Sequence, residues 1–357
     1  MKLPRLRAAD GEPPLRTALL ETVETQRFGC EMAGSPLYST VLEAVAHDVE
    51  TGGGCWSLLE PYAASPFGDA VVLRLLAGVH RIVLDGRATE LAAHYPSVGG
   101  AVGADAADAF LEVIGRHQEE LALAMTRGVQ TNEVGRTAAL LCGYLELARS
   151  GLPLRILEVG ASAGLNLWFD HYRYLSPGWS FGPPDSPLCF EGPFFGRPPV
   201  LVDALRVRER SGCDLDPIDP TSEEGRVRLR SFVWPDQLDR LARLDGALAV
   251  ASTRPPVVER ADAVDWLTEK LAQPVGGCTT VVVHSIVFQY LPDDSKRRFV
   301  EVAEAAGGAA TAEAPVAWLR MEPGGDQAEV RLTTWPGGAT RLLARSSYHG
   351  PPVVLTA

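Results

Sequence analysis

Hydrophobic spacing divides the chain at about residue 150. Before that point, apolar residues recur every three or four positions, which predicts amphipathic helices. Glycine and proline clusters separate these segments, and no strand is expected among them. Residues 1–150 are therefore predicted to form a helical N-terminal domain on the substrate side. The helices are expected over residues 15–28, 37–49, 70–84, 110–127 and 134–149.

Beyond residue 150, short apolar runs alternate with segments of helical period. Alternating strands and helices predict a mainly parallel sheet with helices on both faces. The first strand is expected at residues 154–159, where four of six residues are apolar. Later strands are expected at 227–233, 257–261, 279–288 and 314–321, and helices at 165–174, 238–251, 264–272 and 295–306.

The second predicted domain comprises residues 151–357. Two of its segments do not follow the alternation of strands and helices. Residues 175–225 are dense in proline, glycine and aromatic residues and are too long for an ordinary connection, so we interpret them as an insertion. Residues 329–335 and 340–346 read as strands on either side of Pro336-Gly337-Gly338, which predicts an antiparallel hairpin. The expected fold class is α/β, with a mainly parallel sheet that ends in this hairpin.

The composition limits the kinds of partner that we expect the protein to bind. The formal net charge of −12 repels phosphate backbones and anionic lipids, so neither nucleic acid nor a membrane is an expected partner. No apolar leader follows Met1, and no run approaches the roughly 18 apolar residues that span a bilayer. The six cysteines form no C-x-x-C pair, which argues against zinc, and no metal is expected. We expect a cytoplasmic protein with a small-molecule substrate and leave its oligomeric state open.

The turn after the first expected strand carries the clearest chemical pattern. It reads Glu-Val-Gly-Ala-Ser-Ala-Gly over residues 158–164. Gly160 can adopt a positive φ, and the small residues after it let a ligand approach the backbone. Glu158 stands at the carboxyl end of the strand, where open α/β sheets bind ligands. The pattern predicts a ligand-binding turn.

Three other interpretations of this turn remain open. A dinucleotide fingerprint would need a glycine where Ser162 stands. The letters Gly-x-Ser-x-Gly match the nucleophile elbow of serine hydrolases, with Asp236 or Asp262 and His284 or His349 completing a triad. However, that fold has several strands before the elbow, and none is expected here. The third interpretation is a tight turn without a ligand.

A parallel sheet that ends in an antiparallel hairpin, with an acid-x-glycine turn after its first strand, resembles class I S-adenosylmethionine-dependent methyltransferases. The resemblance covers about residues 152–350 and implies a Rossmann-like fold with S-adenosyl-L-methionine as cofactor. It implies that Glu158 faces the amino end of the cofactor's methionine. The resemblance assigns cofactor binding in this turn to Glu158, Gly160, Ser162, Gly164 and Asn166.

The resemblance also implies roles at later strand ends. The second strand would end at Asp236 and Gln237, where an acid grips the ribose hydroxyls; Asp214 and Asp219 compete for this role. The third would end at Asp262 and Ala263, beside the adenine. A plain helix cap explains Asp236 or Asp262 equally well.

The fourth strand end would lie beside the transferred methyl group. His284 is a candidate general base there, because a histidine titrates near neutral pH. Gln289 and Tyr290 are candidates for orienting the substrate. The alternative for His284 is a buried, hydrogen-bonded side chain.

One N-terminal segment, residues 129–136, is dense in polar side chains before an expected helix. Helix capping accounts for Asn132, but not for Gln130 and Arg136 together. We therefore expect all three to close over the cofactor or substrate. Together with the patterns at 158–167 and 234–237, this segment resembles an uncharacterised bacterial family, domain of unknown function 2332, over nearly the whole chain.

The leading functional hypothesis is a small-molecule methyltransferase that uses S-adenosylmethionine. A cyclase or lyase that consumes the same cofactor is the first alternative. A non-catalytic cofactor-binding module and a serine hydrolase with Ser162 as nucleophile are the others.

Overall fold

A computed structural model describes residues 15–64 and 70–356. The chain forms two compact units, and each is described by itself. The helical unit holds the residues up to Gln130 together with Val227–Leu241, and the sheet unit holds Thr131–Arg226 together with Ala242 onward. Helix α8 (Arg136–Ala148) is the first helix of the sheet unit. The boundary between the units thus lies near residue 130, whereas the sequence predicts it near residue 150.

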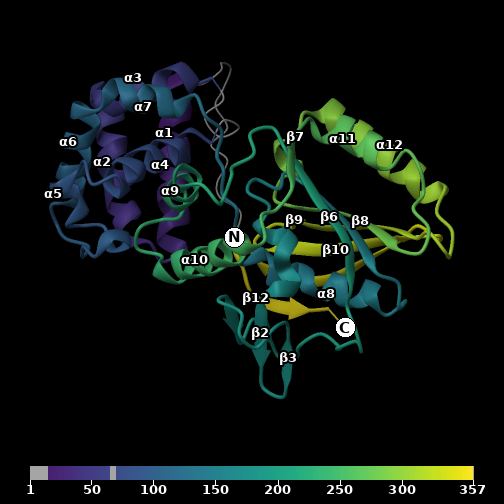
Figure 1. The fold of residues 1–357 in the computed structure, drawn as a ribbon. Helices are drawn as coiled ribbons and strands as arrows, with labels where there is room; N and C mark the ends of the chain where they lie inside the picture. Colours follow the sequence, from purple (N-terminus) through teal and green to yellow (C-terminus); the bar gives the residue numbers. More distant parts are fainter. Residues whose placement is uncertain (1–14, 65–69, 357) are drawn as a thin grey trace. The chain divides into compact units, whose positions relative to one another are not determined.

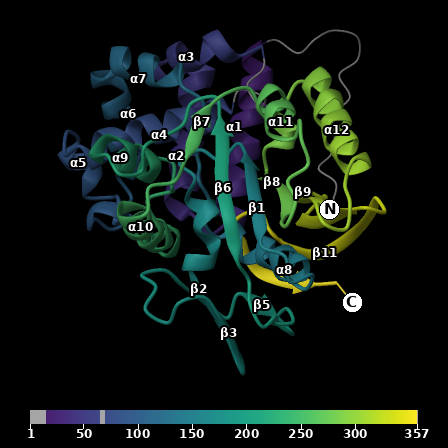
Figure 2. The ribbon, with the colours of Figure 1, turned by 45° about the vertical axis from the view of Figure 1, so that its right-hand side comes forward.

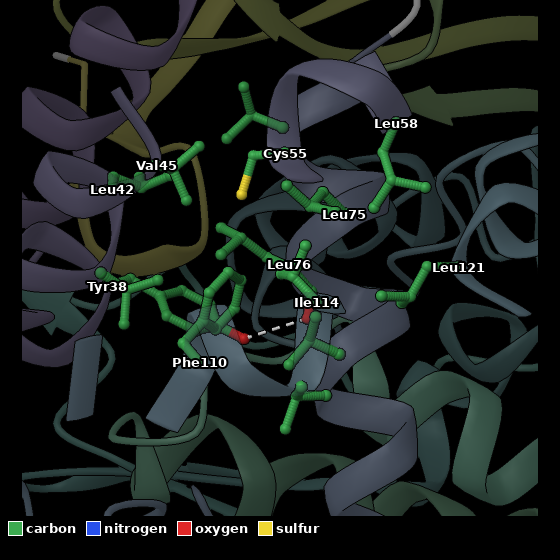
Figure 3. Packing of buried hydrophobic residues seen from close by; sticks show 14 of the residues in the cluster. Tyr38, Leu42, Val45, Cys55, Leu58, Leu75, Leu76, Phe110, Ile114 and Leu121 are labelled. Carbon is green, nitrogen blue, oxygen red and sulfur yellow. Dashed lines mark hydrogen bonds between the residues drawn. The ribbon is translucent and has the colours of Figure 1, made fainter. Parts of the chain in front are cut away.

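The helical unit is built around one apolar core (Figure 3). Tyr38 and Leu42 from one helix meet Leu75 and Phe110 from two others in it, and all four are almost completely buried. The helices expected at 15–28, 37–49 and 70–84 are present, and the one expected at 110–127 is divided at His117. The elements are α1 (Leu15–Met32), α2 (Pro36–Thr51), α3 (Gly54–Leu59), η1 (Glu60–Tyr62), α4 (Val71–Leu84), α5 (Thr89–Ala92), η2 (Pro96–Val98), α6 (Ala106–Arg116) and α7 (Gln118–Met125).

The prediction of a strand at residues 227–233 is wrong. This segment belongs largely to a helix, α9 (Glu223–Ser231), and α10 (Leu238–Thr253) follows it. The alternation of apolar and charged residues suggested a strand, but the local capping decides otherwise. Ser222 Oγ accepts a hydrogen bond from Gly225 N at 3.0 Å, as a helix-starting serine does.

The sheet unit contains a nine-stranded sheet in the order β5-β12-β11-β10-β9-β8-β1-β6-β7. Figure 2 shows its central strands β6, β1 and β8 side by side. Strands β7, β6, β1, β8 and β9 are parallel neighbours, and β9 to β12 are antiparallel. The mainly parallel sheet and the hairpin of β10 and β11 are thus confirmed. The strands are β1 (Leu154–Val159), β5 (Phe194–Phe195), β6 (Val207–Asp214), β7 (Val258–Arg260), β8 (Thr279–Ser285), β9 (Val316–Pro323), β10 (Ala328–Trp335), β11 (Ala339–Ser347) and β12 (Gly350–Leu355).

Helices cover both faces of this sheet. Figure 1 shows α8 on one side and α11 (Ala263–Lys270) and α12 (Asp293–Gly308) on the other. On the second side, Trp266 and Phe299 pack with Leu157 and Val282 of the central strands. Among the residues that the structure describes, no helix has the length and apolar character needed to cross a membrane.

The interpretation of residues 175–225 as an insertion is wrong in part. The range contains β6, which pairs directly with β1 in the centre of the sheet. Charged residues hid this strand, because β7 is short and pairs only with residues 212–214, so the first half of β6 is edge-like and exposed. The rest of the range includes β3 (Trp179–Phe181) and β4 (Cys189–Glu191), which form a small sheet with β2 (Arg173–Ser176).

Candidate functional site

The strand order of the large sheet reverses at β1. The next large-sheet strand along the parallel series, β6, lies on one side of β1, whereas β8 lies on the other. Ligands of open α/β sheets bind at the carboxyl ends of the strands at such a point. The candidate site is therefore sought where β1 and β8 end.

Backbone strain is concentrated at these two strand ends. Ser162, which follows β1, and Ile286, which follows β8, both have a φ of 54°. In the described part of the chain, the other non-glycine residue with positive φ is Ala70. Such a conformation costs roughly 1–3 kcal/mol and is rare for a β-branched residue such as isoleucine. Strain of this kind clusters at functional sites.

The glycines of the turn allow its close packing. Gly160 has the positive φ expected from the sequence, 66°, and a Cβ there would overlap the side chain of Val287. Gly164 has a φ of 71°, and a Cβ there would lie 2.7 Å from both Pro256 and Val258. The turn thus passes between the residues that follow β8 and those that lead into β7.

Hydrogen bonds tie the turn to the end of β6. Ser162 N donates to Asp214 Oδ2 at 2.9 Å, and Ala161 N donates to Cys213 O at 3.0 Å. The other carboxylate oxygen of Asp214 accepts from Asp216 N at 2.9 Å. Asp214 is thus the acid at the end of the strand beside β1.

The assignment of that position to Asp236 is wrong. Asp236 and Gln237 belong to the helical unit, beyond α9, and end no strand. Asp236 accepts from Ser35 Oγ at 2.7 and 2.9 Å and from Leu37 N at 3.1 Å, so it caps α2. Gln237 Nε2 donates to Ala33 O at 2.9 Å. The alternative considered from the sequence, an N-cap before Leu238, differs from this contact: Asp236 caps a helix about 200 residues away in the chain.

Removing this cap should destabilise the helical unit. We expect Asp236→Ala to lower the free energy of unfolding by about 1–3 kcal/mol, because the buried Ser35 hydroxyl and Leu37 N–H lose their acceptor. Urea denaturation followed by circular dichroism measures the change. An unchanged stability together with a lower affinity for S-adenosylmethionine would restore the ribose role instead.

Glu158 is buried at the end of β1, with 4% of its surface exposed. Its pKa is raised to about 8: burial is the main cause and the nearby Asp214 adds to it, whereas a hydrogen bond with Asn166 and the charge of Arg136 oppose the rise. A buried carboxyl with this balance is held in its neutral form near pH 7. Perturbed groups of this kind are candidates for functional sites.

Three buried polar atoms around the turn have no hydrogen-bond partner among the described residues. They are Glu158 Oε2, Ser162 Oγ and Asn166 Oδ1, and each of the three residues is at most 5% exposed. Leaving a buried polar atom unpaired costs about 1–3 kcal/mol, so such atoms need an explanation. A ligand that donates hydrogen bonds would provide one.

Residues 131–136 pack against the same turn. Asn132 Oδ1 accepts from Leu165 N at 3.0 Å, and Asn166 Nδ2 donates to Glu133 O at 3.5 Å. Arg136 Nη1 donates to Ser285 O, the last residue of β8, at 3.0 Å. Asn132 and Arg136 therefore lie with the turn, whereas Gln130 is the last residue of the helical unit, where it is buried.

His284 is buried in β8 with both ring nitrogens engaged. Trp318 Nε1 donates to His284 Nε2 at 2.9 Å, so the ring proton must be on Nδ1, which lies 2.7 Å from Glu322 Oε1. The same oxygen accepts from Val287 N and Phe288 N at 3.1 and 3.2 Å. In this arrangement His284 has no nitrogen left to accept a substrate proton. It positions Glu322, which in turn holds the strained segment after β8.

The remaining candidates lie at the expected strand ends. Asp262 Oδ1 accepts from Val264 N and Asp265 N at 2.9 and 3.1 Å, so it caps α11, which begins at Ala263. Gln289 and Tyr290 form an exposed turn, η4 (Phe288–Tyr290). A substrate role for these two residues stays a prediction.

The contacts of Ser162 do not fit a nucleophile elbow. Its hydroxyl has no partner in residues 15–64 and 70–356, so no base is positioned to activate it. Asp236 and Asp262 cap helices, and His284 is fully engaged. The same ranges contain no group of three or more His, Cys, Asp or Glu side chains suited to a metal ion.

Sequence analysis missed two acidic groups in this region. Glu322 near the end of β9 could have been found by its place at the end of the strand expected at 314–321. Glu133 lies 3.2 Å from His349 Nδ1, across more than 200 residues of chain. No local pattern signals such a pair.

Comparison with protein-family models matches residues 21–354 to a family described as "Uncharacterized protein conserved in bacteria (DUF2332)". Comparisons with curated proteins and with solved structures give no match.

Proposed function

The chain belongs to the bacterial family DUF2332, and from this premise we propose that it is an S-adenosylmethionine-dependent methyltransferase acting on a small molecule. One observation carries the proposal. Glu158, Ser162 and Asn166 present buried, unpaired polar atoms around a glycine turn at the point where the strand order reverses. The net charge of −12 disfavours nucleic acid or an anionic lipid surface as the substrate.

The donor and acceptor pattern of the turn suits this cofactor. The cofactor's amino acid end carries an ammonium group, a strong donor, whose charge would shift the Glu158 carboxyl toward its ionised form, in which Glu158 Oε2 accepts as Asn166 Oδ1 does. Ser162 Oγ can donate to its carboxylate, either directly or through a bridging water. Gly160 and Gly164 leave room for close approach to the backbone.

Asp214 takes the ribose role that the sequence suggested for Asp236. It ends the strand next to β1 and is anchored through Ser162 N and Asp216 N. The oxygens of a carboxylate are acceptors of the kind that the two neighbouring hydroxyl groups of a ribose need. Asp262 caps α11 after β7, on the far side of β6 from β1, and would face the adenine.

When bound, S-adenosylmethionine supplies a methyl group on a sulfonium sulfur, which leaves as a neutral thioether. The protein's own task is to hold the acceptor in line with that group and to exclude water, so positioning supplies much of the rate. We expect the strand ends around the turn to be held rigidly for this task. Glu322 accepts a hydrogen bond from Val287 N, and Ile286 beside it is held at a positive φ.

Isothermal titration calorimetry tests the proposal. The full-length protein is expected to bind S-adenosylmethionine with a dissociation constant well below about 1 mM. Asp214→Asn should weaken binding about tenfold or more, because it removes a charged acceptor. The matched control is Asp219→Asn, since Asp219 is exposed and its hydrogen bonds are made locally, with Thr221 and Ser222.

Absence of binding at millimolar cofactor would contradict the proposal. Equal affinity of the two variants would contradict the role of Asp214. Consumption of the cofactor without any acceptor would replace methyl transfer by a lyase or cyclase reaction on the same site.

A further inference from the structure

The guanidinium group of Arg320, on β9, is held in one orientation. Its Cζ atom lies 4.2 Å from the centroid of the Trp318 ring, where a cation is attracted to the face of the indole. Its Nη1 donates a hydrogen bond to Thr333 Oγ1 of β10 at 3.0 Å. Arg320 is half-buried, and Thr333 is buried. The ring on one face and the acceptor at one end therefore fix the plane of the guanidinium before any ligand binds.

The other edge of this guanidinium is open. Within the part of the chain that the structure describes, Arg320 forms no ion pair, and neither Nε nor Nη2 donates a hydrogen bond. Neither atom is completely buried, so a ligand can reach both. The N–H bonds of Nε and Nη2 point to the same side of the group, and this edge of an arginine matches the two oxygens of a carboxylate.

A second arginine strengthens the case for an anion at this edge. Arg331 on β10 lies directly opposite Arg320, and like charges at opposite positions destabilise a sheet. Burial and the charge of Arg331 lower the pKa of Arg320, and the charge of Glu322 opposes this only in part. Glu329 is paired with Arg331 and Arg345. The charge of Arg320 is thus only partly compensated, and a bound anion would offset it.

The register of the sheet places Arg320 near the glycine turn. Glu158 of β1 pairs with Val283 of β8, and the next residue of β8, His284, pairs with Arg320 of β9. Arg320 therefore lies level with Val159, two strands away. Because neighbouring strands are about 4.8 Å apart, its backbone is about 10 Å from the last residue of β1. A small molecule can span this distance.

Side-chain contacts continue from this position to the turn. Trp318, which lies under the guanidinium, packs in one apolar cluster with Val159. Glu322, at the end of β9, accepts a hydrogen bond from Val287 N, and the Val287 side chain lies against Gly160. The guanidinium and the turn therefore belong to one packed edge of the sheet.

We propose that the open edge of Arg320 binds the carboxylate of the methyl acceptor, which is therefore a small carboxylic acid. This inference rests on the proposed function. Arg320 Nε and Nη2 each donate to one carboxylate oxygen, and Arg331 adds a second positive charge. The group that receives the methyl lies further along the acceptor, toward the glycine turn. Arg320 thus selects and orients the acceptor and takes no part in the transfer itself.

The first experiment identifies the acceptor. The full-length protein is incubated with S-adenosylmethionine that carries a trideuteromethyl group and with a bacterial small-molecule extract. Mass spectrometry with fragmentation identifies the labelled products, which are expected to contain a free carboxylate and to carry the label on another group. A labelled product without a carboxylate, such as a phosphate ester, would overturn the inference. So would a label on the carboxylate oxygen.

The second experiment tests Arg320 with the purified acceptor. Arg320→Gln should raise the KM for the acceptor about 10- to 100-fold, because two charged hydrogen bonds are lost. Both kcat and the affinity for S-adenosylmethionine should stay within about threefold of the wild type. Arg320→Lys keeps the charge but not the planar edge, and its KM should be intermediate.

The amide of the same acceptor separates binding of the carboxylate from a structural role. The wild type should bind the amide about 10- to 100-fold more weakly than the acid, whereas Arg320→Gln should bind both equally. A structural role would weaken both compounds in the variant to the same extent and leave the preference for the acid intact. The comparison on the wild type needs no variant, so it holds even if Arg320→Gln fails to fold.

Arg16→Gln is the matched control. Arg16 Cζ also lies 4.2 Å from the centroid of a tryptophan ring, that of Trp56, and its Nη1 also donates to one oxygen, Glu50 O at 3.2 Å. Arg16 belongs to the helical unit, and its replacement should leave the KM unchanged.

Two kinetic results would overturn the inference while the proposed function stands. One is an unchanged KM in Arg320→Gln, and the other is equal affinity of the wild type for acid and amide. Cofactor binding without any labelled product would also overturn it. Failure of the wild type to bind the cofactor would instead remove the proposed function, and this inference with it.

Discussion

In a Glu158→Gln variant, the free energy of unfolding should exceed that of the wild type at pH 8 and approach it at pH 5. The pKa of Glu158 is raised from 4.5 to about 8, chiefly by burial. Between these values the folded protein keeps a proton that the unfolded chain releases, so wild-type stability falls as pH rises from about 4.5 to about 8. Each unit of pKa difference corresponds to 1.36 kcal/mol, so the loss is on the order of 3–5 kcal/mol. Glutamine does not titrate and removes this loss.

Urea denaturation of both proteins at several pH values measures the effect. Glu191→Gln is a suitable control, because Glu191 is an exposed acid on β4, outside the large sheet. Its difference from the wild type should stay flat across the same range. If Glu158→Gln also runs parallel to the wild type from pH 5 to pH 8, the burial and neutral state of Glu158 are wrong.

Gly160→Ala should destabilise the protein by about 2–5 kcal/mol and abolish cofactor binding. At a φ of 66°, an L side chain costs about 1–2 kcal/mol. The added Cβ would also overlap Val287, and overpacking of this kind costs about 1–3 kcal/mol. The turn can relieve the overlap only by moving away from the segment after β8, which would displace Ser162.

Gly151→Ala distinguishes the backbone cost of a positive φ from the cost of the overlap with Val287. Gly151 has a φ of 75°, but a Cβ there would meet no atom within 4 Å. This control should lose only about 1–2 kcal/mol and keep the cofactor affinity of the wild type. Urea denaturation and calorimetry compare the variants. Equal losses in both would mean that the contact of the turn with Val287 is unimportant.

Prediction from the sequence succeeds best for strands in which every residue is buried. All residues of β1 and β8 are buried, so their apolar runs alone indicate strands of a parallel sheet. Gly160 follows β1 directly, and its positive φ could be expected from that position. In contrast, β6 carries four charged residues because half of its length lacks a second neighbour, and this exposure hid it.

The part of the candidate site that lies in the glycine turn could also be predicted, because its residues are close together in the sequence. Glu158 and Asn166 lie within ten residues of one another, and the turn that joins them is written in consecutive residues. Asp214 was only a competitor for the ribose role, because its strand was not recognised. The preferred Asp236 follows a helix that resembles a strand in its alternation of valine, leucine and arginine.

By itself, the sequence determined that the chain has a helical part, a mainly parallel sheet with a C-terminal hairpin, and a glycine turn after the first strand. These features follow from periodicity and from glycine's backbone freedom, which are local properties. Only the tertiary structure decided that Asp236 caps α2, that His284 is bound by Trp318 and Glu322, and that Glu133 meets His349. Each of these contacts joins residues that are distant in the chain. The pairing depends on which strands and helices become neighbours, and no local pattern records it.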